Sequence, residues 1–330
     1  MRVFLLMVAL AFITRAEGQE LPSGARMLEA GSTHSLDVPP FSFFGSAQSD
    51  NEGNLYFHVD AGSFRKPVVL KLEHSSGDPT LYTLEDEGLK KTTFLNFSVA
   101  PSGQVSILSQ QTDKRIYLLR FTSKGDLAEK VALDLPEYMS AQTFVAFDTG
   151  TVLVSAYYLA DAPDHLRGKG LMALFDVSGK MLKNLSANTE EVDLANVSRH
   201  LTEGGGTVGP DGNMYILQAN QIVVISGLGK IMRRIRFHKP EGTIASKLAV
   251  SQNLVSIWFL REGPKQKMQK QDVTAEYLVL DLLTGKPFGY YVPGKELGQA
   301  AIAVAFSGRE GFTFFDTQDG HVELISSPLR

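Results

Sequence analysis

Apolar and polar residues follow one another along 208–237 in a pattern that is typical of short β-strands. A Pro-Asp-Gly turn opens this segment, and apolar runs of strand length follow at 214–218, 222–226 and 231–237. Short connections that carry Gly, Asn and Ser separate the runs, and no helical period intervenes. The pattern predicts an antiparallel meander. Because one meander cannot bury both of its faces, it also predicts further copies in the chain.

The first recurring feature is a turn followed by an apolar strand. It returns at 51–59, 100–108, 148–158, 250–260 and 306–316. The turn glycines stand at 53, 103, 150, 212 and 311, and in the fifth copy Gln252-Asn253 replaces the Gly turn. With Asn253 as the fifth marker, the steps are 50, 47, 62, 41 and 58 residues. Six copies at this spacing predict the blades of a β-propeller.

The second recurring feature is an apolar strand that ends in a turn of the type D-x-x-G-K. It occurs at 118–127, 174–182, 224–232 and 278–288, in register with the first feature. It predicts the hairpin between the middle strands of each blade, with Gly supplying a positive φ. We assign the strand after each turn of the first kind to the centre of the ring, as the innermost strand of its blade.

The two ends of the chain complement each other. The sixth copy ends after its second strand, at 321–330, whereas 25–37 precedes the first copy and has no innermost strand of its own. N-terminal strands that complete the last blade would close the ring and leave no free sheet edge. The sequence therefore predicts an all-β fold: a six-bladed β-propeller of four-stranded antiparallel blades, with the ring closed by one or more N-terminal strands.

The paired signature, D-G-N-M-Y at 211–215 followed by I-V-V-I-S-G-L-G-K at 222–230, resembles the NHL-repeat and gluconolactonase-like six-bladed β-propellers. For lactonase-like members the resemblance implies a divalent cation at the channel mouth. Its ligands are a Glu that opens the first blade, Asn residues from middle blades, and an Asp just past the strand after a P-D-G turn. This chain has no Glu within 39–45, and Gln218 or Ala219 occupies the place of the Asp. These departures weaken the case for a lactonase-like metal site, because hard cations need converging oxygen ligands.

Composition and the N-terminus narrow the class further. The chain has 330 residues, a formal net charge of -4 and no cysteine, which excludes disulfides, thiol catalysis and thiolate metal sites. The negative charge gives no general attraction to nucleic acid or anionic membranes. A basic start, an apolar run at 3–13 and the small residues Ala16 and Gly18 predict a secretory signal peptide over 1–18, cleaved after one of these two residues. We expect a single domain over 19–330, secreted or periplasmic, with no membrane insertion after cleavage.

The most interesting candidate for a site is the long insertion at 188–206, which we expect to cross the channel mouth. It carries five titratable side chains: Glu190, Glu191, Asp193, His200 and Glu203. A run of glycines at 204–206 offers a hinge. One interpretation is a lid or cation site, and the other is a solvated acidic loop without a ligand. The six stretches that we assign to this face carry a summed charge of -7, which would favour cationic or polyhydroxyl ligands.

Other candidates have ordinary explanations. The enlarged loop at 159–170 contains Asp161, Asp164 and His165, and the loop at 261–276 contains lysines that its acids nearly cancel. Both patterns are typical of solvated loops. We expect Trp258 to lie in the core between blades. No G-x-S-x-G, H-E-x-x-H or G-x-x-x-x-G-K-S/T motif occurs.

These observations favour a monomeric, non-catalytic binding module for a protein, peptide or carbohydrate partner. The alternative is a metal-dependent, lactonase-like hydrolase with its site at the channel mouth. We expect no nucleic-acid partner, and no cofactor other than the divalent cation of the alternative.

Overall fold

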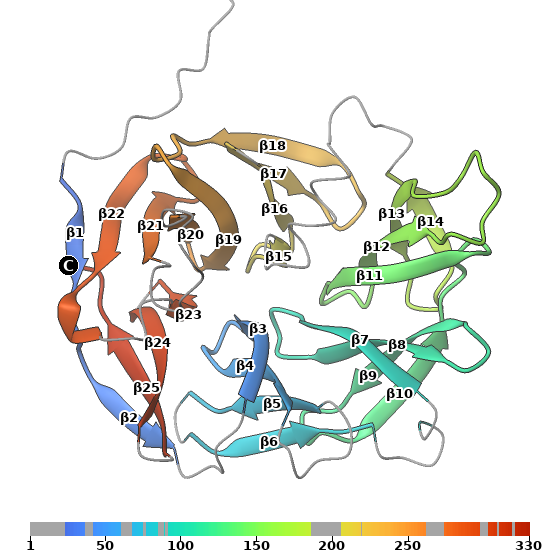
Figure 1. Cartoon of the computed structure of the whole chain (residues 1–330), viewed down its shortest axis with the longest axis horizontal. Helices are drawn as coiled ribbons and strands as arrows, with labels where there is room; N and C mark the ends of the chain where they lie inside the picture. Colours follow the sequence, from blue (N-terminus) through green and yellow to red (C-terminus); the bar gives the residue numbers. More distant parts are fainter. Residues whose placement is uncertain are drawn as a thin grey trace, which may run out of the picture.

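Six sheets stand around a common axis and form a six-bladed β-propeller (Figure 1). The computed structural model describes residues 24–36, 42–60, 68–74, 77–84, 89, 92–185, 206–218, 220–261, 274–297, 303–308, 310–318 and 321–330. Each sheet is one blade, numbered here by the order of its first strand. The predicted all-β, six-bladed fold class is confirmed. Among the described residues, no helix has the length and apolar character that crossing a bilayer requires.

Blades 1 to 3 each consist of four consecutive antiparallel strands. Blade 1 contains β3 (Ser42–Ser49), β4 (Leu55–Asp60), β5 (Val68–Leu72) and β6 (Pro79–Tyr82). Blade 2 contains β7 (Thr92–Val99), β8 (Val105–Gln111), β9 (Ile116–Phe121) and β10 (Leu127–Ala132). Blade 3 contains β11 (Met139–Ala146), β12 (Val152–Tyr158), β13 (Gly170–Phe175) and β14 (Met181–Asn184).

Blades 4 to 6 continue the ring, and the last two receive strands from the N-terminus. Blade 4 contains β15 (Gly206–Val208), β16 (Met214–Gln218), β17 (Gln221–Ile225) and β18 (Ile231–Arg236). Blade 5 contains β19 (Thr243–Ser251), β20 (Leu254–Arg261), β21 (Thr274–Asp281) and β22 (Pro287–Pro293), and a 3-10 turn, η3 (Lys295–Leu297), follows it. Blade 6 contains β23 (Ala303–Ser307), β24 (Gly311–Gln318) and β25 (His321–Ser327).

The N-terminal strands close the ring. β2 (Thr33–Leu36) pairs antiparallel with β25 and becomes the fourth strand of blade 6, which confirms the predicted closure. β1 (Arg26–Leu28) pairs parallel with β22 instead, as a fifth strand of blade 5 that the sequence did not predict. Between them, the Gly31 amide donates to the Ser326 carbonyl at 2.7 Å. The N-terminal segment therefore joins blade 5 to blade 6.

The predicted turns have the expected conformations. The glycines at 53, 103, 150, 212 and 311 all have positive φ, as do those of the second recurring turn. At Gly179 a Cβ atom would lie 2.1 Å from the Ala132 carbonyl oxygen, so only glycine fits where this turn meets blade 2. In the fifth copy the residue in the left-handed conformation is Gln252, with a φ of 54°, rather than Asn253.

The assignment of the innermost strands was wrong. β3, β7, β11, β15, β19 and β23 contact one another from blade to blade around the axis, so the strands after the turns are the second strands of their blades. The innermost strands escaped notice because bulges interrupt their alternation of apolar and polar residues. Four of the six stretches assigned to channel-mouth loops, 36–50, 85–98, 134–143 and 238–247, run into these strands, so the summed charge of -7 does not belong to one surface.

The core is divided among the spaces between blades. Six apolar clusters of described residues each join two neighbouring sheets, for example Leu108 of blade 2 with Phe144 of blade 3. Trp258 is buried in the cluster between blades 5 and 6, which confirms its predicted core position. In the cluster between blades 6 and 1, Val304 and Ala305 of β23 lie with Leu55 and Leu72 of blade 1, and Phe315 and Leu324 of blade 6 pack against them.

Candidate functional site

A small cavity of about 220 Å³ lies on the propeller axis, lined by innermost strands of all six blades. Register shifts between strands 1 and 2 of several blades mark bulges there, including one before Asn96 and one before Thr143. The Asn96 amide Nδ2 donates to Thr143 Oγ1 at 3.0 Å, which joins blade 2 to blade 3. The Gln48 amide bonds both the Phe97 carbonyl and the Val99 amide, which joins blade 1 to blade 2. These polar side chains therefore hold neighbouring blades together.

Lys247 carries a positive charge into this axial region. Its Nζ donates to the Val304 carbonyl at 2.8 Å and to the Ala47 carbonyl at 3.3 Å, and it lies 4.0 Å from the centre of the Trp258 ring. Burial lowers the pKa of Lys247 to about 7. The carbonyl oxygens and the indole face act in the opposite direction, because they favour the ammonium form.

The described lining of the axial cavity offers little to a metal ion. It contributes no Asp or Glu, and the described part of the chain contains no group of three or more His, Asp or Glu side chains that could hold a metal. Glu190, Glu191, Asp193, His200 and Glu203 lie outside the described residues, so the predicted lid or cation site stays a prediction. In the loop at 159–170, Asp164 forms an ion pair with Arg167 at 3.0 Å, as a solvated loop would.

A second hollow, a groove of about 870 Å³, opens between blades 6 and 1. It lies on the face where turns join the first strand of each blade to the second and the third to the fourth, and we call this face the turn face. The described residues that line it include Asp50, Glu73, His74 and Glu310, and turns of blades 4 and 5 contribute Pro210 and Gln252. The groove was not predicted from the sequence, because the turns that line it are far apart in the chain.

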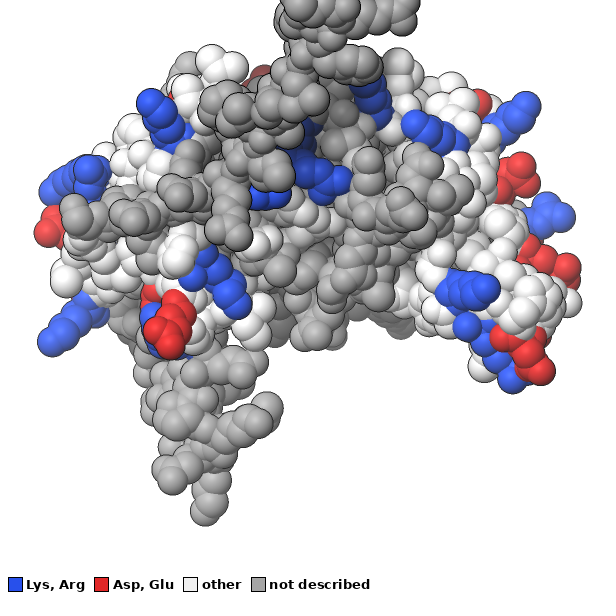
Figure 2. Space-filling view, turned by 90° about the horizontal axis from the view of Figure 1, so that it is seen from above, with Lys and Arg blue, Asp and Glu red and all other residues white. Residues whose placement is uncertain are grey.

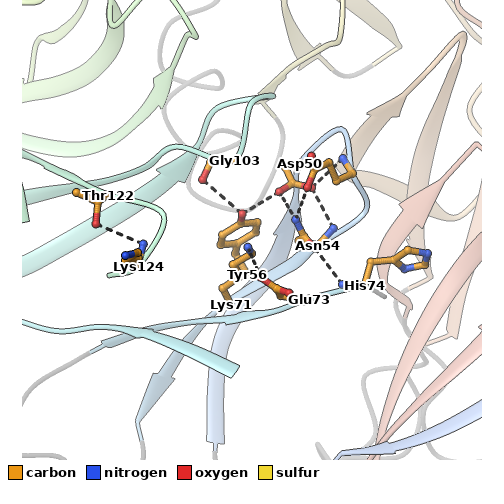
Figure 3. Close-up of polar contacts among 10 residues, drawn as sticks. Asp50, Asn54, Tyr56, Lys71, Glu73, His74, Gly103, Thr122 and Lys124 are labelled. Atoms are coloured by element: carbon orange, nitrogen blue, oxygen red, sulfur yellow. Dashed lines mark hydrogen bonds and ion pairs between the residues drawn. The ribbon is translucent and has the colours of Figure 1, made fainter. Parts of the chain in front are cut away.

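The Asp50 carboxylate organises one wall of the groove (Figure 3). It accepts hydrogen bonds from the amides of Glu52 and Asn54, from Asn54 Nδ2 at 2.7 Å and from the Tyr56 hydroxyl at 2.8 Å. Burial and the adjacent Asp50 raise the pKa of Tyr56, so this hydroxyl keeps its proton and acts as a donor. The same hydroxyl reaches the Gly103 carbonyl of blade 2 at 3.4 Å. The wall is therefore fixed before any ligand arrives.

His74 connects this wall to blade 6. Its backbone amide donates to Asn54 Oδ1 at 3.0 Å, and its Nε2 lies 2.9 Å from Glu310 Oε1. Both side chains are nearly half exposed, and an exposed pair of this kind contributes about 0–1 kcal/mol. The apolar cluster between the blades therefore holds the seam, and the contact between His74 and Glu310 mainly sets the position of two side chains across the groove.

The groove combines an acidic wall with an apolar floor. Four of its described residues are acids, Asp50, Glu52, Glu73 and Glu310, and none of its described residues is Lys or Arg. Lys71, just outside the groove, pairs with Glu73 at 3.1 Å (Figure 3). Leu55, Leu72 and Phe306 form part of the floor. The groove is suited to a ligand with both a positive charge and an apolar portion.

Comparison with known proteins shows the fold alone. No family model and no curated protein matches this chain. A solved structure of a member of the duf4221 family from Bacteroides vulgatus is similar with a TM-score of 0.56 and 13% identity, over 91% of this chain and 97% of that one. A calcium-binding protein, regucalcin, from Agrobacterium tumefaciens gives a TM-score of 0.45 and 15% identity over 92% and 96%. The duf4221 family member thus shares the fold at very low sequence identity.

Proposed function

We propose that this protein is a secreted or periplasmic binding module without catalytic activity, which holds a positively charged peptide segment of a partner between blades 6 and 1. The observation that carries this proposal is the composition of the groove. Four acids line it, hydrogen bonds to Asp50 already fix one of its turns, and buried apolar side chains form part of its floor. Because the site is preformed, its side chains lose little conformational entropy when a ligand binds.

The groove favours a peptide over a carbohydrate. Sugars commonly bind against the exposed face of an aromatic ring, but Phe306, an aromatic residue of this groove, is only 2% exposed. An extended peptide can place Lys or Arg side chains against Glu52 and Glu310 and apolar side chains over the floor. The hydroxyls of Ser32 and Ser326 lie 2.8 Å from each other, an arrangement that joins β2 to β25 rather than preparing a nucleophile.

The test is a binding titration with three short probes: a peptide of alternating Lys and Leu, one of alternating Glu and Leu, and a neutral oligosaccharide. We expect binding of the first alone. The double variant E52Q/E310Q should weaken it about tenfold, because each exposed ion pair contributes at most about 1 kcal/mol. E241Q, which changes an exposed acid outside the described lining of the groove, serves as the matched control. Equal binding of the acidic peptide, or full affinity in E52Q/E310Q, would contradict the proposal.

Export is tested separately by sequencing the N-terminus of the protein recovered from outside the cytoplasm. A cut after Ala16 gives a chain that begins at Glu17, and a cut after Gly18 gives one that begins at Gln19. A protein that retains Met1 and stays in the cytoplasm would contradict the localisation and leave the groove proposal untouched.

A further inference from the structure

Exposed apolar side chains recur on three consecutive blades. Six of them, two from each of blades 3, 4 and 5, form what we call the apolar belt: Val177, Leu182, Leu228, Met232, Leu283 and Phe288. Val177, Leu228 and Leu283 stand on the turns between the third and fourth strands, and Leu228 and Leu283 are 83% and 82% exposed. A series of large exposed apolar side chains is typical of a surface that binds a protein or a membrane.

The backbone explains why the other three members point outward. In β14, β18 and β22 the pairing register shifts so that the second residue of the strand has no partner, and these residues are Leu182, Met232 and Phe288. A bulge of this kind leaves one residue outside the regular alternation of the strand. Blade 2 has the same shift with Ala128 at this place, and the pairing of β5 with β6 in blade 1 shows no shift. The bulge thus recurs in blades 2 to 5, and in blades 3 to 5 the residue at the bulge is a large, exposed apolar one.

Contacts between blades bring the belt residues together. Lys183 Nζ of β14 donates to the Gly229 carbonyl at 2.9 Å, which fixes the Leu228 turn beside β14 and therefore beside Leu182. Arg233 of β18 donates to the Leu283 carbonyl at 2.8 Å, which fixes that turn beside β18 and Met232. Each turn therefore rests on the outer strand of the preceding blade. The belt is continuous along the edge of the turn face.

Basic residues accompany the belt. The same turns and outer strands carry Lys180, Lys183, Lys230, Arg233, Arg234, Arg236 and Lys286. Their acids, Asp176 and Asp281, accept hydrogen bonds from amides of their own turns. Figure 2 views the rim from the top of Figure 1, where β18 lies, and blue Lys and Arg side chains are visible beside the grey atoms near the middle of that view. This arc of the rim is thus locally positive in a chain whose net charge is -4.

We propose that the protein docks on an anionic lipid bilayer through the apolar belt. Aliphatic side chains on turn tips can enter the boundary between headgroups and acyl chains, while Lys and Arg beside them contact anionic headgroups. A lipid surface fits this geometry better than a protein partner does, because Val177, Leu228 and Leu283 stand on the turns of three different blades and the belt extends along a rim, whereas anchors at protein interfaces meet in one packed patch.

This docking has a consequence for the groove. Blades 6 and 1 lie across the ring from blade 4 (Figure 1), so contact through blades 3 to 5 tilts the disc. The acidic groove then stays away from the anionic surface and remains open to solvent. The inference concerns a different surface from the peptide groove and does not rest on the function proposed for it.

The chain contains no cysteine, which permits a local test. We would introduce L228C, L283C or S123C and attach a fluorophore that brightens in apolar surroundings. Ser123 stands on the corresponding turn of blade 2, outside the belt. With vesicles of phosphatidylglycerol and phosphatidylcholine, we expect a blue shift at positions 228 and 283 but none at 123. No shift at 228 and 283, or an equal shift at 123, would overturn the proposal.

Sedimentation with the same vesicles tests the contribution of each group. L228D/L283D should lower the binding constant at least about tenfold, and K230Q/K286Q should lower it about fivefold for each charge removed. A128D, the same kind of change at the bulge of blade 2, is the matched control and should bind like the wild type. All forms have the same N-terminus, so the residues before β1 cannot explain a difference between them. Unchanged binding in L228D/L283D, or a belt that instead mediates self-association in sedimentation velocity, would overturn the proposal.

Discussion

Lys247 places a buried positive charge at the point where three blades meet. Its ammonium bonds carbonyls of blades 6 and 1 and lies on the ring of Trp258 from its own blade. A buried charge is costly unless its hydrogen-bonding groups are satisfied, and here main-chain carbonyls and an aromatic face take the place of a carboxylate. The contacts of the Lys247 side chain therefore stabilise the native state, and the loss of its hydration destabilises it.

This balance predicts a pH dependence. The pKa of Lys247 falls from 10.5 to about 7 on folding, so between these values the unfolded chain binds more protons than the native one. Its contribution to the free energy of unfolding should therefore rise with pH from about 7 to about 10. K247M, which keeps the length of the side chain without its charge, should flatten that rise. Urea unfolding of both proteins at several pH values measures the effect, and parallel curves would contradict it.

The sequence could not indicate this role. Lys247 ends the stretch 238–247, which was assigned to a loop, and nothing in the run S-K-L-A-V indicates that its lysine is buried. The bulge between Ala245 and Lys247 changes the side to which the lysine points, and a bulge leaves no clear signal in the composition of the strand. For Asp50, in contrast, the local structure was predicted and the surroundings were not. Its turn was expected from the sequence, but its position beside a groove depends on the packing of the first blade against the last.

Gln252 shows where a predicted turn carries strain. A residue with a side chain at a φ of 54° costs about 1–2 kcal/mol relative to glycine, and part of this is offset because glycine loses more entropy on folding. We expect Q252G to raise the free energy of unfolding by about 0.5–1 kcal/mol. G103A, at the equivalent turn of blade 2, is the opposite change and should lower it. Thermal unfolding compares the two, and a destabilised Q252G would contradict this reasoning.

At the scale of strands, the turn chemistry made the fold predictable. Glycine turns and apolar second and third strands repeat in register, and these strands are the buried middle of each sheet. The first strands were misplaced because they mix polar and apolar residues and face the axis on one side. The pairing of β1 with β22 was also beyond prediction, since the three residues R-M-L carry no pattern of their own.

The closing strands give a prediction at this scale. A chain that lacks residues 1–36 loses β1 and β2, which uncovers the edges of β22 and β25. Exposed edges pair with other chains, so we expect a lower melting temperature and association at high protein concentration. A chain that lacks only residues 1–23 keeps both strands and is the control. Equal melting temperatures and equal solubility of the two truncated chains would show that the closure contributes little.

At the scale of the whole molecule, the turn face has two unlike halves. Blades 6 and 1 present the acidic groove, and blades 3 to 5 present the apolar belt with its Lys and Arg residues. Neither half is visible in the net charge of -4, which averages over both. Only the order of blades around the ring, with the first beside the last, separates the two surfaces.

This separation predicts that the two surfaces act independently. No described residue is shared between the groove and the belt. Effects of distant substitutions usually add within about 0.5 kcal/mol. E52Q/E310Q should therefore weaken binding of the basic peptide and leave vesicle binding unchanged. L228D/L283D should weaken vesicle binding and leave peptide binding unchanged. The variant with all four substitutions should show both losses in full. Titration of the peptide in the presence and absence of anionic vesicles measures the coupling directly. A change in peptide affinity of more than about fivefold on vesicle binding would mean that the lipid surface reaches the groove or that the disc deforms, and it would contradict the tilted arrangement.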